Sequence, residues 1–192
     1  MTSDPDDAEL ITRSLGGDVD AFMEVVRRHE AAVGAYLARR AGRDAAEDLL
    51  GEVWVAALAS RAAYDRSFPG ARPWLFGVAH NVLRRHWRSR PAEEPRADVP
   101  DASSGWDPWA AVDDRVAAEP VVLRALALLR PQQREILALV AWEDLTVADA
   151  GRAIGVPPGT ARRYLHEARA ALRDAPGMAA LLTEHDTIKE AR

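Results

Sequence analysis

Apolar residues recur at helical spacing in three stretches of the first half of the chain. They lie three or four positions apart over residues 22–37, 46–58 and 75–82, which places them on one face of an α-helix in each stretch. Asp20 precedes the first stretch as a candidate N-cap, and Pro73 suits the first position of the third helix. No segment alternates apolar and polar residues as a half-buried strand does. The pattern therefore predicts a domain of helices.

The same spacing returns in the second half of the chain and predicts four more helices. They cover residues 121–129, a segment after Pro131 whose apolar face is Ile136, Leu137 and Val140, residues 147–154 with Thr146 as the cap, and residues 160–173. Glycine and proline fill residues 155–159, between the last two helices. A short helix, a tight turn and a second helix predict a helix-turn-helix.

Residues 91–118 separate the two helical regions. Several prolines and mostly acidic charges predict a flexible acidic linker there. Trp106 and Trp109 within it either begin a short helix that docks on one domain or contact a partner. The predicted fold class is all-α, with two small helical domains. The expected divisions are a flexible acidic N-terminus (1–17), a helical domain (18–90), the linker (91–118), a helix-turn-helix domain (119–173) and a C-terminal tail (174–192).

Composition narrows the class of protein. The chain has 192 residues, no cysteine and a formal net charge of −5. Without cysteine, a disulfide scaffold and a thiolate metal site are excluded. No apolar run approaches the ~20 residues of a membrane-spanning helix. The acidic start lacks the order of a signal peptide, so a cytoplasmic protein without a membrane segment is expected.

The net charge conceals two basic blocks. Residues 72–90 hold five arginines and no acid, and residues 121–173 hold eight arginines against five acids. The acids concentrate in residues 1–20 and 91–120. A total of −5 argues against a nucleic-acid partner, but separate basic blocks are the electrostatic footprint of one.

The last predicted helix has a core face and a basic face. The core face holds Ala161, Leu165, Ala168 and Leu172, and the basic face holds Arg162, His166, Arg169 and Arg173, with Arg163 beside them. As the second helix of a helix-turn-helix, it suits the DNA major groove. Thr160 is expected to cap it and leave its first amides facing a phosphate. The alternative is an ordinary solvated basic face.

The third predicted helix carries a second candidate nucleic-acid face. Its exposed stripe holds Asn81, Arg84, Arg85 and Arg88, with Trp74 seven residues before Asn81. An amide for base edges, guanidinium groups for phosphates and an aromatic ring for stacking describe such a face. Core packing is the alternative for Trp74, and His80 and His86 can be bystanders.

Two further features bear on function. The loop of residues 64–70 carries Tyr64, Arg66 and Phe68 and can hold an unstacked base. The second predicted helix carries an acidic ridge of Asp44, Asp48 and Glu52 at four-residue spacing, with Glu47 beside Asp48. Such a ridge is either solvated or docks on a basic partner surface.

Enzyme signatures are absent from the sequence. There is no Gly-Lys-Ser/Thr phosphate loop, no GxGxxG and no GxSxG, and the five histidines are scattered. No catalytic residue, no metal ligand set and no cofactor is expected.

Three segments resemble the extracytoplasmic-function (ECF) sigma factors of bacterial RNA polymerase. They are AEDLLGEVW (46–54), RPWLFGVAHNVLRRHWR (72–88) and residues 129–173, in the family's order and at its spacing. The resemblance implies a region 2 domain that binds core RNA polymerase and opens the −10 element, and a region 4 domain that binds the −35 duplex and the polymerase. It also implies that an anti-sigma factor is a possible partner.

The resemblance assigns roles residue by residue. The polymerase-binding residues would be Asp44, Glu47, Asp48 and Glu52. The −10 element would be met by Tyr64, Arg66, Phe68, His80, Asn81, Arg84, Arg85 and Arg88. The −35 element would be met by Thr160, Arg162, Arg163, His166 and Arg169.

The chain departs from the family pattern at several positions. His80 stands where arginine is usual, which would make one strand contact pH-dependent. Ala150 and Ala161 replace branched apolar residues and thin the helix-turn-helix core, so either its helices pack closer or the tail (Met178, Leu181, Leu182) covers the gap. Glu167 replaces a usual arginine and lowers the basic charge there.

Two other functions remain open from the sequence alone. One is a stand-alone helix-turn-helix regulator of transcription, and the other is a polymerase- or anti-factor-binding scaffold that has lost DNA recognition. A separate hypothesis concerns regulation: the acidic residues 1–20 and 91–120 could cover the basic faces in the free protein. Removing residues 1–17 would then strengthen DNA binding.

Overall fold

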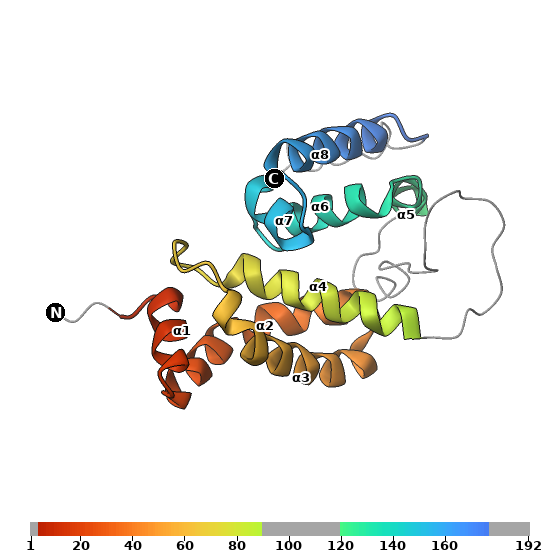
Figure 1. The fold of residues 1–192 in the computed structure, drawn as a ribbon. Helices are drawn as coiled ribbons and strands as arrows, with labels where there is room; N and C mark the ends of the chain where they lie inside the picture. The colour runs from red at the N-terminus through yellow and green to blue at the C-terminus, as the bar shows by residue number, and fades with distance from the viewer. Residues whose placement is uncertain (1–3, 90–119, 177–192) are drawn as a thin grey trace, which may run out of the picture. The chain divides into compact units, whose positions relative to one another are not determined.

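The computed structural model describes residues 4–89 and 120–176, and every regular element in these two ranges is a helix (Figure 1). They form two compact units, here called the first unit (4–89) and the second unit (120–176). The predicted all-α class with two helical domains is confirmed. The predicted linker, with Trp106 and Trp109, and residues 177–192 of the predicted tail lie outside the described residues.

The first unit consists of four α-helices and one short 3₁₀ helix. They are α1 (Asp7–Leu15), α2 (Val19–Ala41), α3 (Arg43–Ser60), η1 (Arg61–Ala63) and α4 (Arg72–Ser89) (Figure 1). α2, α3 and α4 pack against one another, and α1 packs on α2 and η1. Fully buried side chains from three helices, including Leu37, Val53 and Phe76, form the core. The three helices predicted from apolar spacing are therefore present.

The N-terminal segment corrects the sequence analysis. Residues 1–17 were expected to be flexible, but α1 forms within them because Leu10 and Ile11 bury against the rest of the unit. Asp6 caps α1 by accepting a hydrogen bond from the Glu9 N–H at 2.8 Å. The large apolar residues of this short helix are only Leu10, Ile11 and Leu15, yet burial of the first two suffices to dock it.

The caps of the next helices also differ from expectation. Asp18, rather than Asp20, is the N-cap of α2 and accepts from the Ala21 N–H at 3.0 Å. Gly42 joins α2 to α3 with a φ of 82°, a conformation that side chains other than glycine's rarely adopt. The helix predicted to begin at Pro73 starts one residue earlier.

The second unit consists of α5 (Pro120–Ala127), α6 (Pro131–Ala141), α7 (Val147–Ile154) and α8 (Pro158–Arg173). α8 packs on α5, α6 and α7. Thr146 caps α7, as predicted, by accepting from the Asp149 N–H at 3.1 Å. On α6 the fully buried apolar residues include Ile136 and Leu139, while the predicted Leu137 and Val140 are only half-buried.

The turn between α7 and α8 gives the predicted helix-turn-helix. Gly155 ends α7 in the left-handed region, with a φ of 73°. The Val156 N–H donates to the Gly151 carbonyl at 2.9 Å. Thr160 does not cap α8, because the helix already begins at Pro158 and Thr160 lies within its first turn. The prediction for that cap was wrong.

The helix-turn-helix core is closed by close approach of its helices. A Cβ atom on Gly151 would lie 2.9 Å from the Ala161 Cβ and 3.0 Å from the Val156 carbonyl oxygen. Ala150, Ala161 and Ala168 are fully buried. The small residues that seemed to thin this core therefore let α7 pack directly on α8, the first of the two solutions considered from the sequence.

Candidate nucleic-acid interfaces

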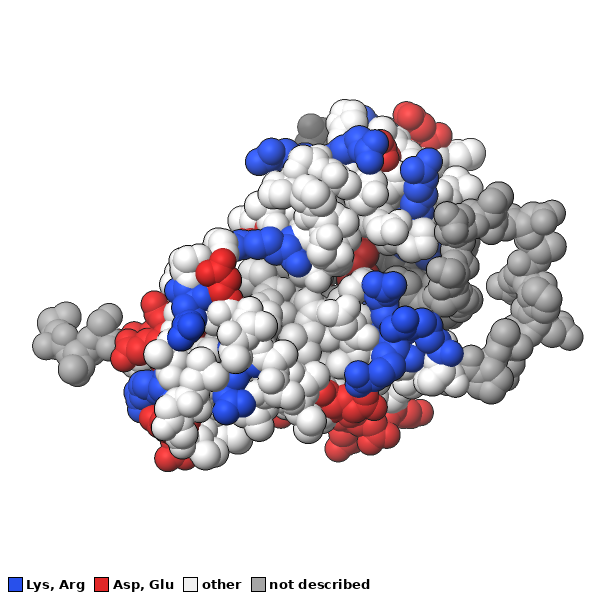
Figure 2. All heavy atoms as spheres, in the orientation of Figure 1, with Lys and Arg blue, Asp and Glu red and all other residues white. Residues whose placement is uncertain are grey.

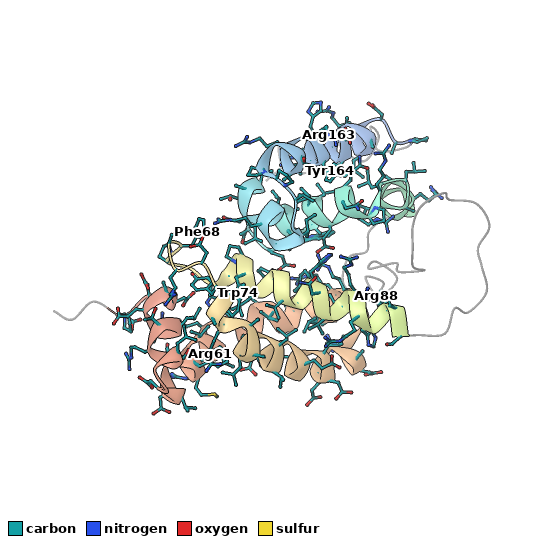
Figure 3. All side chains as sticks on the ribbon, viewed as in Figure 1. Arg61, Phe68, Trp74, Arg88, Arg163 and Tyr164 are labelled. Atoms are coloured by element: carbon teal, nitrogen blue, oxygen red, sulfur yellow. The ribbon has the colours of Figure 1, made fainter. Side chains whose placement is uncertain are left out.

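The first candidate surface is the exposed side of α8. Ala161, Leu165 and Ala168 are buried, and the predicted basic residues all lie on the exposed side: Arg162, Arg163, His166, Arg169 and Arg173. In Figure 3 the Arg163 and Tyr164 side chains both extend from α8, and the Arg163 guanidinium carbon lies 5.4 Å from the Tyr164 ring centroid. Thr160 is half-buried at the start of the same helix. The structure thus brings the predicted α8 residues onto one helix surface.

Glu167 interrupts this basic surface with a defined set of contacts. Its carboxylate accepts a hydrogen bond from Gln133 Nε2 at 2.6 Å, which ties α8 to α6. Gln133 in turn accepts from the Arg130 N–H at 3.0 Å. Arg163 Nε lies 3.9 Å from the other carboxylate oxygen. The acidic side chain therefore joins two helices as well as lowering the positive charge.

The second candidate surface lies along α4. Asn81, Arg84, Arg85 and Arg88 are all exposed, while Ala79, Val82 and Leu83 on the opposite side are buried. Figure 2 shows a group of arginine side chains over the C-terminal part of α4, beside a group of acidic side chains. Figure 3 locates Arg88 near the C-terminal end of the same helix. The predicted face is present, and it borders a surface of opposite charge.

The boundary between these two charged surfaces is bridged by an ion pair. Arg85 donates to the Glu52 carboxylate at 2.7 Å, from α4 to α3. Both side chains are more than half exposed, so the pair stabilises the fold little. Its consequence is that one predicted DNA-binding arginine and one predicted polymerase-binding glutamate partly neutralise each other in the free protein.

The acidic ridge on α3 is exposed as predicted. Asp44, Glu47, Asp48 and Glu52 are all exposed. Beyond them on the same helix, Val55 is 70% exposed and Leu58 43%. The apolar spacing over residues 46–58 predicts that Leu58 faces the core, whereas Val55 lies outside that spacing. The ridge thus continues into exposed apolar residues.

The 64–70 loop divides into a support and an exposed part. Tyr64 is only 5% exposed; its hydroxyl donates to the Phe68 carbonyl, and its ring centroid lies 5.3 Å from that of Trp74. Phe68 is 37% exposed on the outer part of the loop (Figure 3), and Arg66 is exposed. The structure therefore places Tyr64 beneath the loop, where its ring cannot stack on a base, and leaves Phe68 and Arg66 accessible.

His80 does not join the exposed α4 face. It is 8% exposed, and it lies four residues after Phe76 and three before Leu83, both of which are fully buried. Asn81, the next residue, is exposed. The predicted strand contact of His80 is thus at odds with its position on the buried side of the helix, because helical residues share a side with those three and four positions away.

A buried carboxylate that sequence analysis did not single out lies at the base of the 64–70 loop. Asp7 is 6% exposed. Its Oδ2 accepts from the Ala71 N–H at 2.8 Å and lies 2.7 Å from His29 Nε2. Its own N–H donates to the Pro69 carbonyl at 3.1 Å. No sequence signal identified it, since a single aspartate in an acidic segment has no distinguishing pattern.

The surroundings of Asp7 favour its charged form. Burial by itself raises the pKa of this carboxyl, but hydrogen bonds from His29 and Ala71, together with the charges of His29 and Arg28, outweigh it and hold the pKa below its ordinary value. Arg28 Nη1 lies 3.5 Å from Asp7 Oδ1. The aspartate is therefore a paired, ionised group at neutral pH.

Within residues 4–89 and 120–176 no three or more histidine or acidic side chains gather as a metal site would require. Among the helices in those ranges, none combines the length and apolar character needed to span a bilayer.

Comparison with protein families gives two matches in chain order. The model described as "Sigma-70 region 2" matches residues 25–92, and the one described as "Sigma-70, region 4" matches residues 121–172. The first match covers most of the first unit and the second covers nearly all of the second unit. Each candidate surface lies in one matched region.

Curated relatives resemble the chain along most of its length. RNA polymerase sigma factor CarQ of Myxococcus xanthus is 34% identical over 175 residues, covering 86% of this chain and 94% of CarQ. ECF RNA polymerase sigma factor SigF of Caulobacter vibrioides is 32% identical over 171 residues, covering 86% of this chain and 90% of SigF.

Two solved structures share the fold. CnrH, solved with the cytosolic domain of CnrY, superposes with a TM-score of 0.61 at 22% identity, covering 93% of this chain and 97% of CnrH. RpoE of Bartonella quintana, solved with the anti-sigma factor NepR, gives a TM-score of 0.56 at 22% identity, covering 81% of this chain and 96% of RpoE.

Proposed function

The chain belongs to the ECF family of RNA polymerase sigma factors, and from this membership we propose that it binds core RNA polymerase and directs promoter recognition, −10 melting and transcription initiation. The observation that carries the proposal is that each of the two family matches falls on its own helical unit. Region 2 and region 4 fall in order on two separate helical units, and each unit has an exposed basic helix face. A sigma factor needs both, since it contacts a promoter at two elements.

In the first unit, α4 and the 64–70 loop would meet the −10 element. The exposed Asn81 amide offers a donor and an acceptor to an unpaired base. Phe68 offers a ring on which a base can stack, and Arg84 and Arg88 offer charge to the strand's phosphates. Tyr64 would act from below, by holding the loop that carries Phe68.

The α3 surface would meet the polymerase. It combines the exposed acids Asp44, Glu47, Asp48 and Glu52 with exposed Val55 and Leu58. Charge at the rim steers association, whereas apolar area supplies most of the binding free energy. Docking here would also compete for Glu52 and so release Arg85 toward DNA.

In the second unit, α8 would enter the major groove of the −35 duplex. Arg162, Arg163, His166 and Arg169 lie along its exposed side, and its first turn, with Thr160, would approach the phosphate backbone. Only part of this set need contact bases, because guanidinium groups serve both guanine edges and phosphates.

The stand-alone regulator is the less favoured function. It would use the helix-turn-helix alone and gives no reason for the region 2 match or for relatives that align along both units. As a sigma factor the chain would act in the cytoplasm, where RNA polymerase is, and would catalyse no reaction of its own. We also propose that an anti-sigma factor is a partner, because the solved structure of RpoE of Bartonella quintana contains the anti-sigma factor NepR.

Transcription in vitro tests the proposed function. Core RNA polymerase with the purified chain should initiate at promoters mapped from RNA 5′ ends after overexpression, and core alone should not. Replacing Arg162 and Arg169 by alanine should reduce initiation at low promoter concentration, whereas Arg124→Ala, on α5, should not. Folded protein that neither co-purifies with core polymerase nor initiates would overturn the proposal.

A further inference from the structure

The 64–70 loop is attached to the first unit at both ends through α1. At its start, η1 packs on α1. At its end, Asp7 holds the backbone on either side of Gly70: the Asp7 N–H donates to the Pro69 carbonyl at 3.1 Å, and the Asp7 carboxylate accepts from the Ala71 N–H at 2.8 Å. We call these two bonds the Asp7 clasp. Residues 65–70 are otherwise exposed, so the clasp is a principal restraint on where the loop lies.

The clasp is itself held by α2. His29 Nε2 lies 2.7 Å from Asp7 Oδ2, the same oxygen that Ala71 uses. Arg28 reaches Asp7 Oδ1 at 3.5 Å, the Pro5 carbonyl at 2.8 Å and the Asp4 carboxylate at 3.0 Å. Glu24 orients Arg28 at 2.8 Å. A chain of charged and polar contacts thus runs from α2 through Asp7 to the end of the loop.

Capping of α1 does not account for a buried carboxylate at this place. Asp6 already caps the helix through the Glu9 N–H. Burying a charged carboxylate costs free energy unless it is paired and hydrogen-bonded, and Asp7 directs its bonds to the loop and to α2 instead of to its own helix. The arrangement is therefore suited to positioning the loop.

We propose that Asp7 is a positioning residue for −10 recognition: through the clasp it fixes the 64–70 loop, and hence Phe68 and Arg66, in the place where an unpaired base of the promoter is selected. The proposal rests on the proposed function, because the loop selects a base only if the chain is a sigma factor. Asp7 lies beneath the loop and contacts no DNA itself. Its loss should therefore relax base selectivity without reducing polymerase binding.

The experiment compares three variants with matched chemistry. Asp7→Ala removes the carboxylate that Ala71 uses. Asp7→Asn keeps the shape and one acceptor oxygen but removes the charge that pairs with His29 and Arg28. Asp6→Ala is the control, since it weakens α1 at its cap but leaves the loop contacts in place. Each holoenzyme transcribes a promoter library with the −10 bases randomised, and the transcripts are sequenced.

The clasp predicts a specific loss. Asp7→Ala should reduce preference at one or two −10 positions by about tenfold, the scale of one base contact, with selectivity at the −35 element and affinity for core polymerase unchanged. Asp7→Asn should show a smaller loss, and Asp6→Ala should keep the wild-type preference. Unchanged −10 preference in Asp7→Ala, or an equal loss in Asp6→Ala, would overturn the proposal.

Hydrogen exchange on the free chain separates this proposal from the proposed function. Backbone amides of residues 65–68, 70 and 71 should exchange faster in Asp7→Ala than in wild type, and at the wild-type rate in Asp6→Ala. This measurement needs neither polymerase nor promoter. Exchange at the wild-type rate in Asp7→Ala would overturn the clasp even if transcription proceeds. Failure of wild-type holoenzyme to initiate would overturn the sigma-factor function, and with it the role of Asp7 in −10 recognition, but would leave the clasp standing.

Discussion

At the scale of single residues, Gly151 sets how closely the two helices of the helix-turn-helix approach. The space for its missing side chain is occupied on two sides, by Ala161 Cβ and by the Val156 carbonyl oxygen. Neither is the end of a flexible side chain, so neither can move aside cheaply. A change as small as one methyl group must shift α7, α8 or both.

Gly151→Ala should therefore destabilise the second unit although alanine favours helices. Overpacking at a close helix contact costs about 1–3 kcal/mol, and because the Gly151 Cβ would meet backbone and a neighbouring Cβ we expect the upper part of that range, above the ~1 kcal/mol that alanine contributes over glycine within a helix. Chemical denaturation of the purified variant measures this. Gly159→Ala is the matched control: nothing lies within 4 Å of its added Cβ, and it should be neutral or stabilising. A Gly151→Ala variant as stable as wild type would contradict the close packing.

Asp7 gives a pH prediction whose sign follows from its lowered pKa. A carboxyl with a lower pKa in the folded than in the unfolded state stabilises the fold above its ordinary pKa of 3.8 and loses that contribution as pH falls through the folded value. The Asp7→Asn variant has no carboxyl at this position, so it has no such contribution to lose. The urea midpoint should thus fall less in Asp7→Asn than in wild type between about pH 6 and about pH 3.

The comparison isolates Asp7 from other acids. Asp18 and Glu24 also have lowered pKa values, through hydrogen bonds from Arg13 and Arg28 respectively, but both are present in the two proteins. Asp7→Asn should be the less stable protein at neutral pH, because a neutral amide pairs less strongly with His29 and Arg28. Parallel pH curves for the two proteins would show that the carboxylate is not held as described.

At the scale of helices, apolar spacing was a reliable guide and local polar detail was not. The periodic stretches over residues 22–37, 46–58 and 75–82 all lie on helices with a buried apolar face, because burial requires that spacing; Leu58, at 43% exposed, is the exception. α1 was missed because its 9 residues hold only three large apolar ones, Leu10, Ile11 and Leu15, which is too few for a sustained period. Its docking depends on the surface that α2 and η1 offer, which only the folded chain presents.

The candidate surfaces show the same division. The basic stripes of α4 and α8 follow from helical periodicity and were found from the sequence. Tyr64 and His80 were predicted to meet DNA together with exposed residues, but both are buried. The Tyr64 ring packs against Trp74, and His80 lies on the buried side of α4. The Asp7 clasp joins residues 64 positions apart in sequence, so no local pattern reveals it.

The α8 stripe predicts how DNA binding depends on salt. Each arginine that neutralises a phosphate releases about one counterion, so replacing Arg162 and Arg169 by alanine should lower the slope of log K against log salt by about 2. Fluorescence anisotropy with a −35 duplex, at several salt concentrations, measures the slope for the holoenzyme. Arg124→Ala on α5 should keep the wild-type slope, and an unchanged slope in the double variant would exclude phosphate contacts by this pair.

At the scale of the whole molecule, the acidic N-terminus is engaged within its own unit. Asp4 and Asp7 contact Arg28, Asp7 contacts His29, and Asp18 pairs with Arg13 at 2.8 Å. These contacts argue against the hypothesis that residues 1–20 cover the predicted DNA-binding arginines. Deleting residues 1–17 would remove α1 and expose the core that Leu10 and Ile11 cover, so the expected result is loss of stability instead of tighter DNA binding.

The other acidic segment keeps its place in that hypothesis. Residues 91–120 hold eight acids against two arginines and join two units that each carry an exposed basic face. In that hypothesis, charges on a segment joined to both units would be at high local concentration near both faces, where they would compete with phosphates for the same arginines. Screening weakens that competition as salt rises, because exposed charges interact little beyond a Debye length of ~10 Å at 0.1 M.

Replacing those eight acids by their amides should therefore tighten binding of the free chain to promoter duplex, by about tenfold at low salt, with the difference shrinking as salt is added. The replaced residues are Glu93, Glu94, Asp98, Asp101, Asp107, Asp113, Asp114 and Glu119. A variant with the same residues 91–118 in shuffled order is the control; it should bind like wild type, because the effect depends on charge and not on sequence. Equal affinity of the amide variant and wild type at low salt would contradict this. It would mean that the acids of residues 91–120 add to the net charge of −5 but do not weaken DNA binding by the basic faces.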